Sequence, residues 1–354
     1  MGREPGGRER SDEEAAGATR LVERAFALAR EGRVDEARAL YLRLRALADD
    51  VAPVPKAARW LIDVGALAER LGERADAEAL LQRAVVIAEN ALGPRHLEVS
   101  SCLARLARLY DGEERHAEAE PLYRRVLSIE EQALGPRHPQ VAASLRNLGA
   151  LYCEVGRLDE GERLLLRALA LFRRAGARRF SDEGVTLHWL AWLNEQRGHL
   201  TCAERLYLEA QALLEEGLGL EHPTVAGCLM HLADLYATEQ RTEQAERLFR
   251  RVLRIREAAF GPEDARVANC AHALARLLDR EGRLVEAERL YQRALFIRER
   301  SFRERCHGQR GAKGHDDDAE RARVLLDLAA LYRRARRHGA ARRLESRAAR
   351  RRRD

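Results

Sequence analysis

A fixed spacing of 42 residues runs through most of this 354-residue chain. Its marker is a glutamate that follows Ala or Gly and precedes a Leu two positions on; it recurs at Glu78, Glu120, Glu162, Glu204, Glu246 and Glu288. Each period holds two stretches in which apolar residues return every three or four positions, and it closes on a Leu-Gly-Pro-x-His-Pro turn. This pattern predicts two amphipathic helices per period and an elongated array of helical hairpins.

Composition favours an all-α fold. Ala, Leu, Glu and Arg are abundant, aromatic residues make up 5% of the chain, and no alternating run of β-branched residues suggests a sheet. We expect an α-solenoid of about seven to eight hairpins. The expected parts are a disordered N-terminal segment at 1–18, the solenoid with about seven hairpins at 19–302, an inserted surface loop at 303–317, a terminal basic hairpin at 318–347 and an Arg-rich tail at 348–354.

The residues of the repeated turn have a structural explanation. A glycine follows the second helix at positions 93, 135, 219 and 261, where a left-handed cap is expected, and Pro139 and Pro223 stand where the next helix begins. Because His138 and His222 occur in this turn, with Asp264 substituting in one repeat, we assign them to capping rather than to chemistry. Similarly, Cys102, Cys228 and Cys270 occupy one column, which indicates a packing position and not a disulfide.

The absence of long apolar segments and the distribution of charge indicate where the protein is located and which part of it is basic. No stretch approaches the roughly 20 apolar residues that span a bilayer, and the polar N-terminus does not resemble a signal peptide, so we expect a cytoplasmic protein with no membrane partner. The net charge of +6 is unevenly placed, because the segment from residue 301 onward holds 17 Lys plus Arg against 8 Asp plus Glu. The basic character therefore belongs to the C-terminal end.

The repeat resembles the tetratricopeptide repeat. Leu148, Gly149 and Tyr152 in a first helix, followed by Gly161, Leu165 and Ala168 in a second, match that family's pattern of large and small residues. The 42-residue period, with the turn over 134–141 and Ala-Glu-Pro-Leu-Tyr over 119–123, is similar to the kinesin light chain type. The resemblance implies a right-handed superhelix whose first helices line a concave groove for extended peptides or partner proteins.

The same resemblance indicates which residues face the groove. In kinesin light chain the leading groove position is commonly Asn, whereas this chain holds Ile62, Ala104, Arg146, His188, Met230, His272 and Leu326 there. One turn later on the same helix faces stand Ala66, Arg108, Ala150, Trp192, Asp234, Arg276 and Ala330. Neither that Asn ladder nor a heptad coiled coil is present, so a kinesin cargo role is not expected.

From these positions we predict a partner-binding site. Its members are Arg108, Arg146, His188, Trp192, Met230, Asp234, His272 and Arg276. An aromatic residue flanked by arginines is typical of interface hot spots. The arginines favour an acidic segment in the partner, and Asp234 limits how far that preference extends. The alternative is that Trp192 only covers helix surface or packs on the next repeat.

No motif indicates catalysis. The sequence has no phosphate-binding loop, nucleophile elbow, His-Glu-x-x-His or paired Cys-x-x-Cys, so we expect neither enzyme activity nor a cofactor. Cys306, His307 and His315, with Asp316 to Asp318, form the one evident group of metal-ligand types. Only one thiolate is present and the spacing fits no closed zinc site, so no metal is predicted.

Two functions remain open. The first is a non-catalytic scaffold or adaptor that binds a peptide or partner segment in the groove. The second is a regulatory protein whose Arg-rich region, 333–353, binds nucleic acid or another polyanion. That region lacks the interleaved aromatic residues that would stack on bases, and arginine-rich helices also serve as solvated caps of a last repeat.

Overall fold

The computed structural model describes residues 20–29, 31–49, 55–175, 179–308 and 315–349. The chain divides into two compact units, Met1–Gly176 and Ala177–Asp354, and each is described by itself. The segment 1–18, for which the sequence predicts disorder, and the last five residues of the predicted tail lie outside the described residues.

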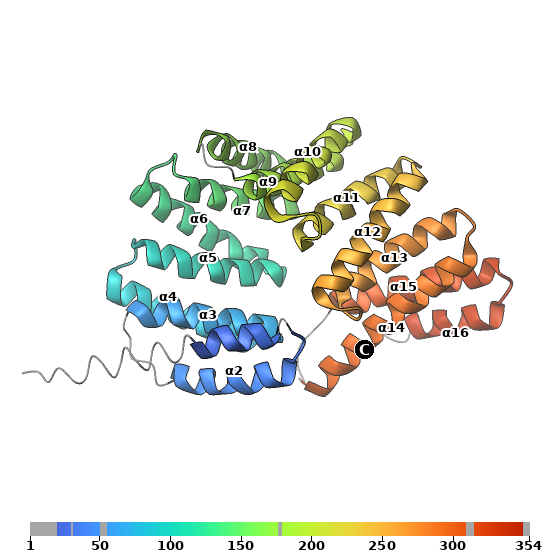
Figure 1. Ribbon diagram of the computed structural model, residues 1–354, viewed down its shortest axis with the longest axis horizontal. Helices are drawn as coiled ribbons and strands as arrows, with labels where there is room; N and C mark the ends of the chain where they lie inside the picture. The colour runs from blue at the N-terminus through green and yellow to red at the C-terminus, as the bar shows by residue number, and fades with distance from the viewer. Residues whose placement is uncertain (1–19, 30, 50–54, 176–178, 309–314, 350–354) are drawn as a thin grey trace, which may run out of the picture. The chain divides into compact units, whose positions relative to one another are not determined.

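In the first unit, helices follow one another as antiparallel pairs (Figure 1). Apolar residues of the helix over 20–29 and of α2 belong to one core cluster, and three further helix pairs follow along the chain. The helices are α2 (Val34–Asp49), α3 (Pro55–Leu71), α4 (Arg74–Leu92), α5 (Leu97–Gly112), α6 (His116–Leu134), α7 (Pro139–Glu154) and α8 (Leu158–Arg174).

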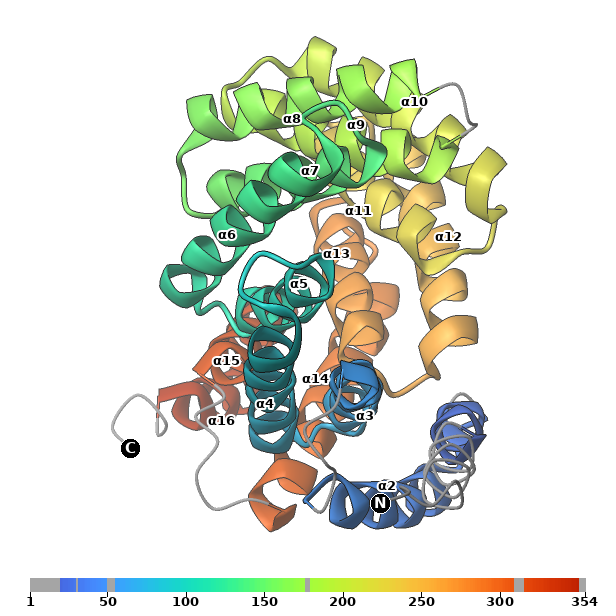
Figure 2. The ribbon, with the colours of Figure 1, turned by 90° about the vertical axis from the view of Figure 1, so that its left-hand side faces the viewer.

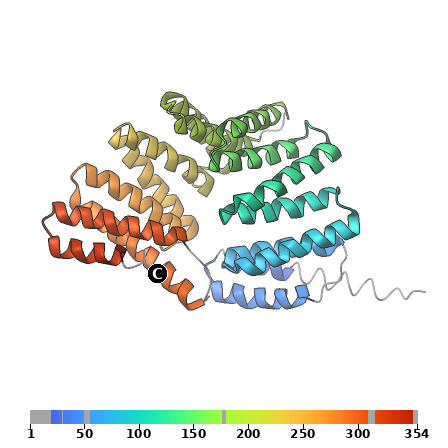
Figure 3. The ribbon, with the colours of Figure 1, turned by 180° about the vertical axis from the view of Figure 1, so that it is seen from behind.

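The second unit repeats the arrangement, as the opposite view in Figure 3 also shows. Its helices are α9 (Phe180–Gln196), α10 (Leu200–Leu218), α11 (Pro223–Thr238), α12 (Thr242–Phe260), α13 (Ala265–Arg280), α14 (Leu284–Gly308), α15 (His315–Arg334) and α16 (His338–Ala349). The all-α prediction is therefore confirmed.

First helices of successive hairpins contact one another within each unit. Helix α3 contacts α5 in the first unit, and α11 lies between α9 and α13 in the second (Figure 2). We call the surface that the first helices form the A face of a unit. It carries the positions that the sequence assigns to the groove.

The repeated turn caps both of its helices. Gly135 and Gly219 end α6 and α10 with φ of 86° and 89°, values that a residue with a side chain adopts only under strain. Nδ1 of His138 then accepts a hydrogen bond from the backbone N–H of Gln140, and His222 does the same for Thr224. Asp264 accepts from Arg266 in the same column. The predicted capping role of these residues is confirmed.

The predicted apolar stripes form the core. Leu145, Leu151 and Phe172 are no more than 1% exposed, and the thiols of Cys102, Cys228 and Cys270 are buried and free. Gly161 replaces the usual Ala of the 42-residue series because Gly149 lies against it. A Cβ on Gly161 would come within 2.9 Å of the Gly149 carbonyl oxygen, so helices α7 and α8 approach more closely than Ala allows.

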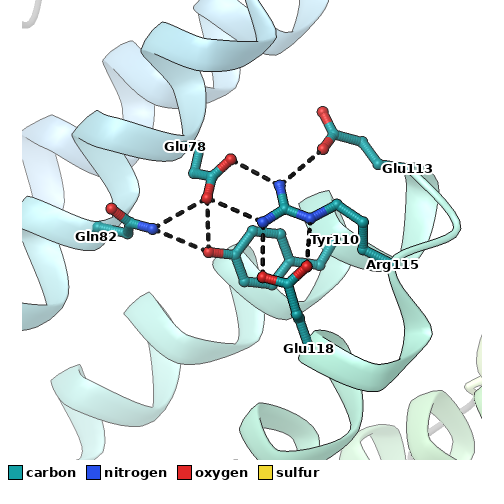
Figure 4. Close-up of polar contacts among 6 residues, drawn as sticks. All are labelled: Glu78, Gln82, Tyr110, Glu113, Arg115 and Glu118. Atoms are coloured by element: carbon teal, nitrogen blue, oxygen red, sulfur yellow. Dashed lines mark hydrogen bonds and ion pairs between the residues drawn. The ribbon is translucent and has the colours of Figure 1, made fainter. Parts of the chain in front are cut away.

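The glutamate of the series joins one hairpin to the next (Figure 4). Glu78 on α4 accepts hydrogen bonds from Tyr110 Oη at 3.0 Å and from Arg115 Nη1 at 2.7 Å, and Arg115 also bonds Glu118. The Arg115 guanidinium lies 4.1 Å from the centre of the Tyr110 ring. The hydrogen bond from Arg115 is the main cause that lowers the pKa of Glu78. We call this arrangement the Glu–Arg bridge.

The same bridge recurs along the chain, with an arginine from the turn between the two helices of the following hairpin. The equivalent pairs are Glu120–Arg157, Glu204–Arg241, Glu246–Arg283 and Glu288–Arg337. The periodic glutamate is thus explained by the stacking of neighbouring hairpins and not by chemistry.

One predicted boundary is corrected. The expected surface loop at 303–317 is shorter, because α14 continues to Gly308 and α15 begins at His315, which leaves residues 309–314 outside the described part. The sequence before Gly308 is dominated by Arg and Glu, which have high helix propensity, and nothing there stops the helix.

Candidate partner-binding surface

The first unit carries two of the predicted site residues. Arg108 is exposed on α5, and Arg146 is half-buried on α7, with its guanidinium 5.8 Å from the centre of the Phe172 ring. Ile62 and Ala104, which hold the leading groove position in the two preceding first helices, are also half-buried on this A face, whereas Ala150 is buried.

A hollow of about 380 Å³ lies between α3 and α5. Its lining includes three positions that the sequence assigns to the groove, Ile62, Ala104 and Arg108. Arg59, Asp63, Glu98, Ser101 and Arg105 complete the lining. The hollow therefore has an apolar floor and three guanidinium groups against two carboxylates.

The arginines of this hollow are poorly neutralised. Burial, and then the neighbouring Arg108, lower the pKa of Arg105. Its Nε is buried without a hydrogen-bond partner among the described residues, and the nearest carboxylate, Glu69, is 3.7 Å from Nη2. Arg59 and Arg108 form no hydrogen bond or ion pair within the described part of the chain. An anionic group in the hollow would satisfy these donors.

The A face of the second unit is aromatic. Trp192 on α9 is half-buried and stacks edge-on against Trp189, with ring centres 6.0 Å apart. His188 packs against His231 of α11 at 4.9 Å and against Tyr207 at 5.8 Å. Burial, and then His231, lower the pKa of His188 to about 3, so its ring is neutral near pH 7. His188 therefore contributes an aromatic surface and no charge.

Carboxylates lie beside these rings. Glu195 accepts a hydrogen bond of 2.7 Å from Tyr207 Oη, and burial raises its pKa. Asp234 on α11 is exposed to solvent, but the protein atoms crowded around it, and then Glu195, raise its pKa to about 6. Because Glu195 disfavours the charge of Asp234, a cationic group placed near both carboxylates would be stabilised.

Two further predicted site residues, His272 and Arg276, lie close to the carboxylate of Asp327. His272 Nε2 lies 2.8 Å from Asp327 Oδ2, and Arg276 Nε is 4.0 Å from the same oxygen. Their side chains differ in access, since His272 is 12% exposed and Arg276 is 55% exposed. Met230 is half-buried on α11. Arg276 is thus the more accessible of the pair.

The tetratricopeptide repeat family matches residues 56–132, 112–174, 140–216 and 224–300. These segments cover more than half of the chain and coincide with the hairpins described above. The chain belongs to the tetratricopeptide repeat family. A comparison with curated protein sequences finds no match. In the part of this repeat protein that the structure describes, no helix is long and apolar enough to cross a membrane.

Several solved structures share this repeat fold. The apo form of RapI aligns with a TM-score of 0.60 at 14% identity, over 81% of this chain and 99% of that chain. A chain of the APC/C hetero-tetramer Cut9–Hcn1 gives 0.57 at 15% identity, over 77% and 45%. BtubC (BKLC) from P. vanneervenii gives 0.53 at 21% identity, over 72% and 89%. At these identities the likeness shows the fold alone.

The eight predicted site residues of this repeat protein fall into two sets. Arg108 and Arg146 belong to the first unit, while the other six, including Trp192, belong to the second. The sequence predicts that Arg108 and Arg146 flank Trp192. Because these arginines and Trp192 belong to different units, this stays a prediction. Sequence reasoning missed Arg59, Arg105 and Glu195, because they occupy helix positions next to the assigned groove columns.

Arginines of the C-terminal hairpin pair with acidic residues of the second unit. The pairs are Arg333–Glu345, Arg334–Asp279, Arg337–Glu288 and Arg347–Glu299. The first pair joins α15 to α16, and the other three hold the last hairpin against α13 and α14. They favour the explanation of this basic hairpin as the cap of the repeat array.

Proposed function

We propose that this tetratricopeptide repeat protein is a non-catalytic scaffold that binds segments of partner proteins on its A faces. Repeat membership supports a role in protein interaction, and one structural neighbour is a component of the Cut9–Hcn1 hetero-tetramer. The observation that carries the proposal is the hollow between α3 and α5, which predicted groove positions line. Three arginines face two carboxylates there, and the Nε of Arg105 has no hydrogen-bond partner among the described residues.

The first unit fits an acidic segment. A carboxylate entering the hollow could accept hydrogen bonds from Arg105 and Arg108, and it would relieve the repulsion between them. An apolar neighbour in the same segment would contact Ile62 and Ala104 at the floor. Such a combination of anchors gives specificity for acidic residues next to apolar ones.

The second unit fits a different segment. Trp192 offers an aromatic surface next to Glu195, which is one helical turn away on α9. Glu195 in turn lies close enough to Asp234 to raise the pKa of Asp234. Aromatic faces and carboxylates together favour a Lys or Arg side chain. We therefore assign a cationic or apolar anchor of the partner to this face.

Binding of peptides to the full chain tests the proposal. The probes are a 15-residue peptide rich in Asp, Glu and Leu and a matched peptide in which Lys and Arg replace the acidic residues. We expect Arg105→Gln/Arg108→Gln to weaken the acidic peptide by about tenfold or more, as expected for the loss of charge-assisted hydrogen bonds. The matched control is Arg74→Gln/Arg163→Gln, which removes two exposed arginines of second helices.

Equal loss in the control pair would show that only overall charge attracts the acidic peptide. Such a result would contradict binding in the hollow. Measurements at two salt concentrations separate the two cases further, because long-range attraction between exposed charges falls steeply with salt. Circular dichroism of each variant checks that the helices are retained.

A further inference from the structure

A tyrosine of the second helix bonds an acidic residue of the first helix in alternate hairpins. The pairs are Tyr123–Asp111 at 3.3 Å, Tyr207–Glu195 at 2.7 Å and Tyr291–Asp279 at 3.5 Å. In the intervening hairpins Leu165 and Phe249 replace the tyrosine, and Cys153 and Ala237 replace the acid. The acidic residue is present where the tyrosine is present, and its role in the repeat is to accept a hydrogen bond from the tyrosine hydroxyl.

The neighbours of that acid differ between two equivalent hairpins. At Asp279, Arg334 from the next first helix supplies a guanidinium and forms an ion pair. In the repeat register, Glu154 at the end of α7 corresponds to Arg334, and His116 at the start of α6 corresponds to Leu284. Asp111 thus faces a carboxylate and an imidazole at the place where Asp279 has a cation.

The three side chains converge closely. Nδ1 of His116 lies 3.3 Å from Asp111 Oδ1 and 4.0 Å from Glu154 Oε2, and the three ligand atoms all lie within 4.8 Å of one another. Four ligands at about 2.1 Å from a tetrahedral ion are about 3.4 Å apart. The separations found here are therefore near those of a coordinated ion, and small rotamer adjustments close the difference.

The surroundings also suit an ion. Tyr123 donates to the second oxygen of Asp111, and a hydrogen bond of this kind fixes the orientation of a ligating carboxylate. The side chains of Asp111, His116 and Glu154 are 22%, 26% and 38% exposed, so an ion can reach them from solvent. Arg108, one turn before Asp111 on α5, forms no ion pair with it in the described part of the chain.

We propose that Asp111, His116 and Glu154 bind a divalent transition-metal ion, with Zn²⁺ as the best fit, at the ends of α5 and α7 and the start of α6. One imidazole and two carboxylates are ligands that Zn²⁺ accepts, whereas Mg²⁺ and Ca²⁺ prefer oxygen ligands alone. The ion supplies the positive charge that Arg334 supplies at Asp279. The fourth coordination position faces solvent and takes a water molecule.

The proposal is independent of peptide binding in the hollow. A bound ion would tie three helices of two successive hairpins together, whereas the ion pair of Arg334 joins α15 to α13 in the second unit. Binding of the ion to the folded chain alone would also raise its thermal stability.

Titration of the metal-free full chain with Zn²⁺, followed by isothermal calorimetry, tests the site. We expect one ion per chain at this site, and a loss of affinity of about tenfold or more in His116→Gln and in Glu154→Gln. Co²⁺ in place of Zn²⁺ gives an absorption spectrum that reports coordination geometry, and we expect tetrahedral Co²⁺ in the wild type only. Mg²⁺ serves as the negative control ion.

Glu154→Arg is the decisive variant, because it rebuilds the ion pair of Asp279 and Arg334 at Asp111. We expect it to abolish Zn²⁺ binding and to melt no lower than the metal-free wild type. Exposed His199→Gln is the matched control and should bind Zn²⁺ as the wild type does. If the wild type takes up no more Zn²⁺ than Glu154→Arg, the two carboxyls are balanced by a shared proton and the proposal is wrong. Zn²⁺ binding that persists in Glu154→Arg but is lost in Cys306→Ser/His307→Gln would place the ion elsewhere and equally overturn it.

Discussion

The A faces of the two units carry opposite chemistry on the same framework. The first has a hollow with Arg59, Arg105 and Arg108 around an apolar floor, whereas the second has Trp192 beside the carboxylates of Glu195 and Asp234. The capped turns and the Glu–Arg bridges are the same in both units. We therefore propose that the repeat sets where a partner can be bound, and that the residues that depart from it decide what is bound.

The largest expected effect tests whether the helical hairpins of the two units are stabilised by the same core packing. Leu165 and Phe249 occupy one column, in the first and second unit respectively, and are 0% and 1% exposed. Replacing either with Ala should lower the free energy of unfolding of its own unit by about 3 kcal/mol, through lost burial and a cavity. Hydrogen exchange followed by mass spectrometry resolves the two units. Loss of protection in only one of the two variants would contradict a common framework.

Trp192→Ala is expected to have the next largest effect, on binding. Removal of a central aromatic anchor should weaken a partner bound to the second unit by about 2 kcal/mol, while the melting temperature changes little. Phe296→Ala, which removes a 58% exposed aromatic residue from α14, is the control. Titration of the cationic peptide measures both variants. An unchanged affinity in Trp192→Ala would remove this residue from the site.

The histidine pair predicts a pH dependence confined to the second unit. Burial lowers the folded-state pKa of His188 to about 3 and of His231 to about 4, below the unfolded value of about 6.5. Between these values the unfolded chain binds more protons than the folded one. The pair should therefore lower the stability of the fold progressively as the pH falls from 6.5 to 4.

Two carboxylates oppose that trend in the same window. Burial raises the pKa of Glu195 and Asp234, and stability associated with these groups is lost as the pH rises through their folded-state values. For this reason the test compares the wild type with His231→Phe. Denaturation at each pH should show a weaker loss of stability in the variant on acidification. Parallel pH profiles would rule out the assigned role of the pair.

The smallest expected effect concerns the Glu–Arg bridge. Arg115 has a side chain that is 31% exposed, so solvent screens its pairs with Glu78 and Glu118. Arg115→Met should therefore lower the free energy of unfolding by about 0.5 kcal/mol, part of which comes from the lost contact with the Tyr110 ring. Urea denaturation in low and high salt measures the change, and a larger effect in high salt would contradict an electrostatic bridge.

Local signals explain why so much of the fold follows from the sequence. Helix faces, the glycine caps at Gly135 and Gly219 and the capping histidines depend on residues within one or two turns of each other. The Glu–Arg bridge joins residues 37 positions apart, as in Glu78–Arg115 and Glu246–Arg283. A fixed separation of this kind is visible when the repeats are aligned by column, although the choice of partner requires the structure.

The candidate sites depended on side-chain directions that the repeat does not specify. The sequence identifies Arg108, but it does not show that Arg105 lines the same hollow and has a buried Nε without a hydrogen-bond partner among the described residues. It also treats His272 as available, whereas Asp327, 55 residues away, binds it. The correspondence between Glu154 and Arg334 is also hard to see in the sequence, because an insertion of 12 residues shifts the last hairpin out of the 42-residue register.

The most direct test of the account exchanges charge on one A face at a time. In the full chain, Arg108→Glu should weaken the acidic 15-residue peptide by about tenfold and leave the cationic peptide within about twofold. Asp234→Lys should weaken the cationic peptide and spare the acidic one. Equal effects of each substitution on both peptides would contradict the claim that the two units bind segments of different chemistry.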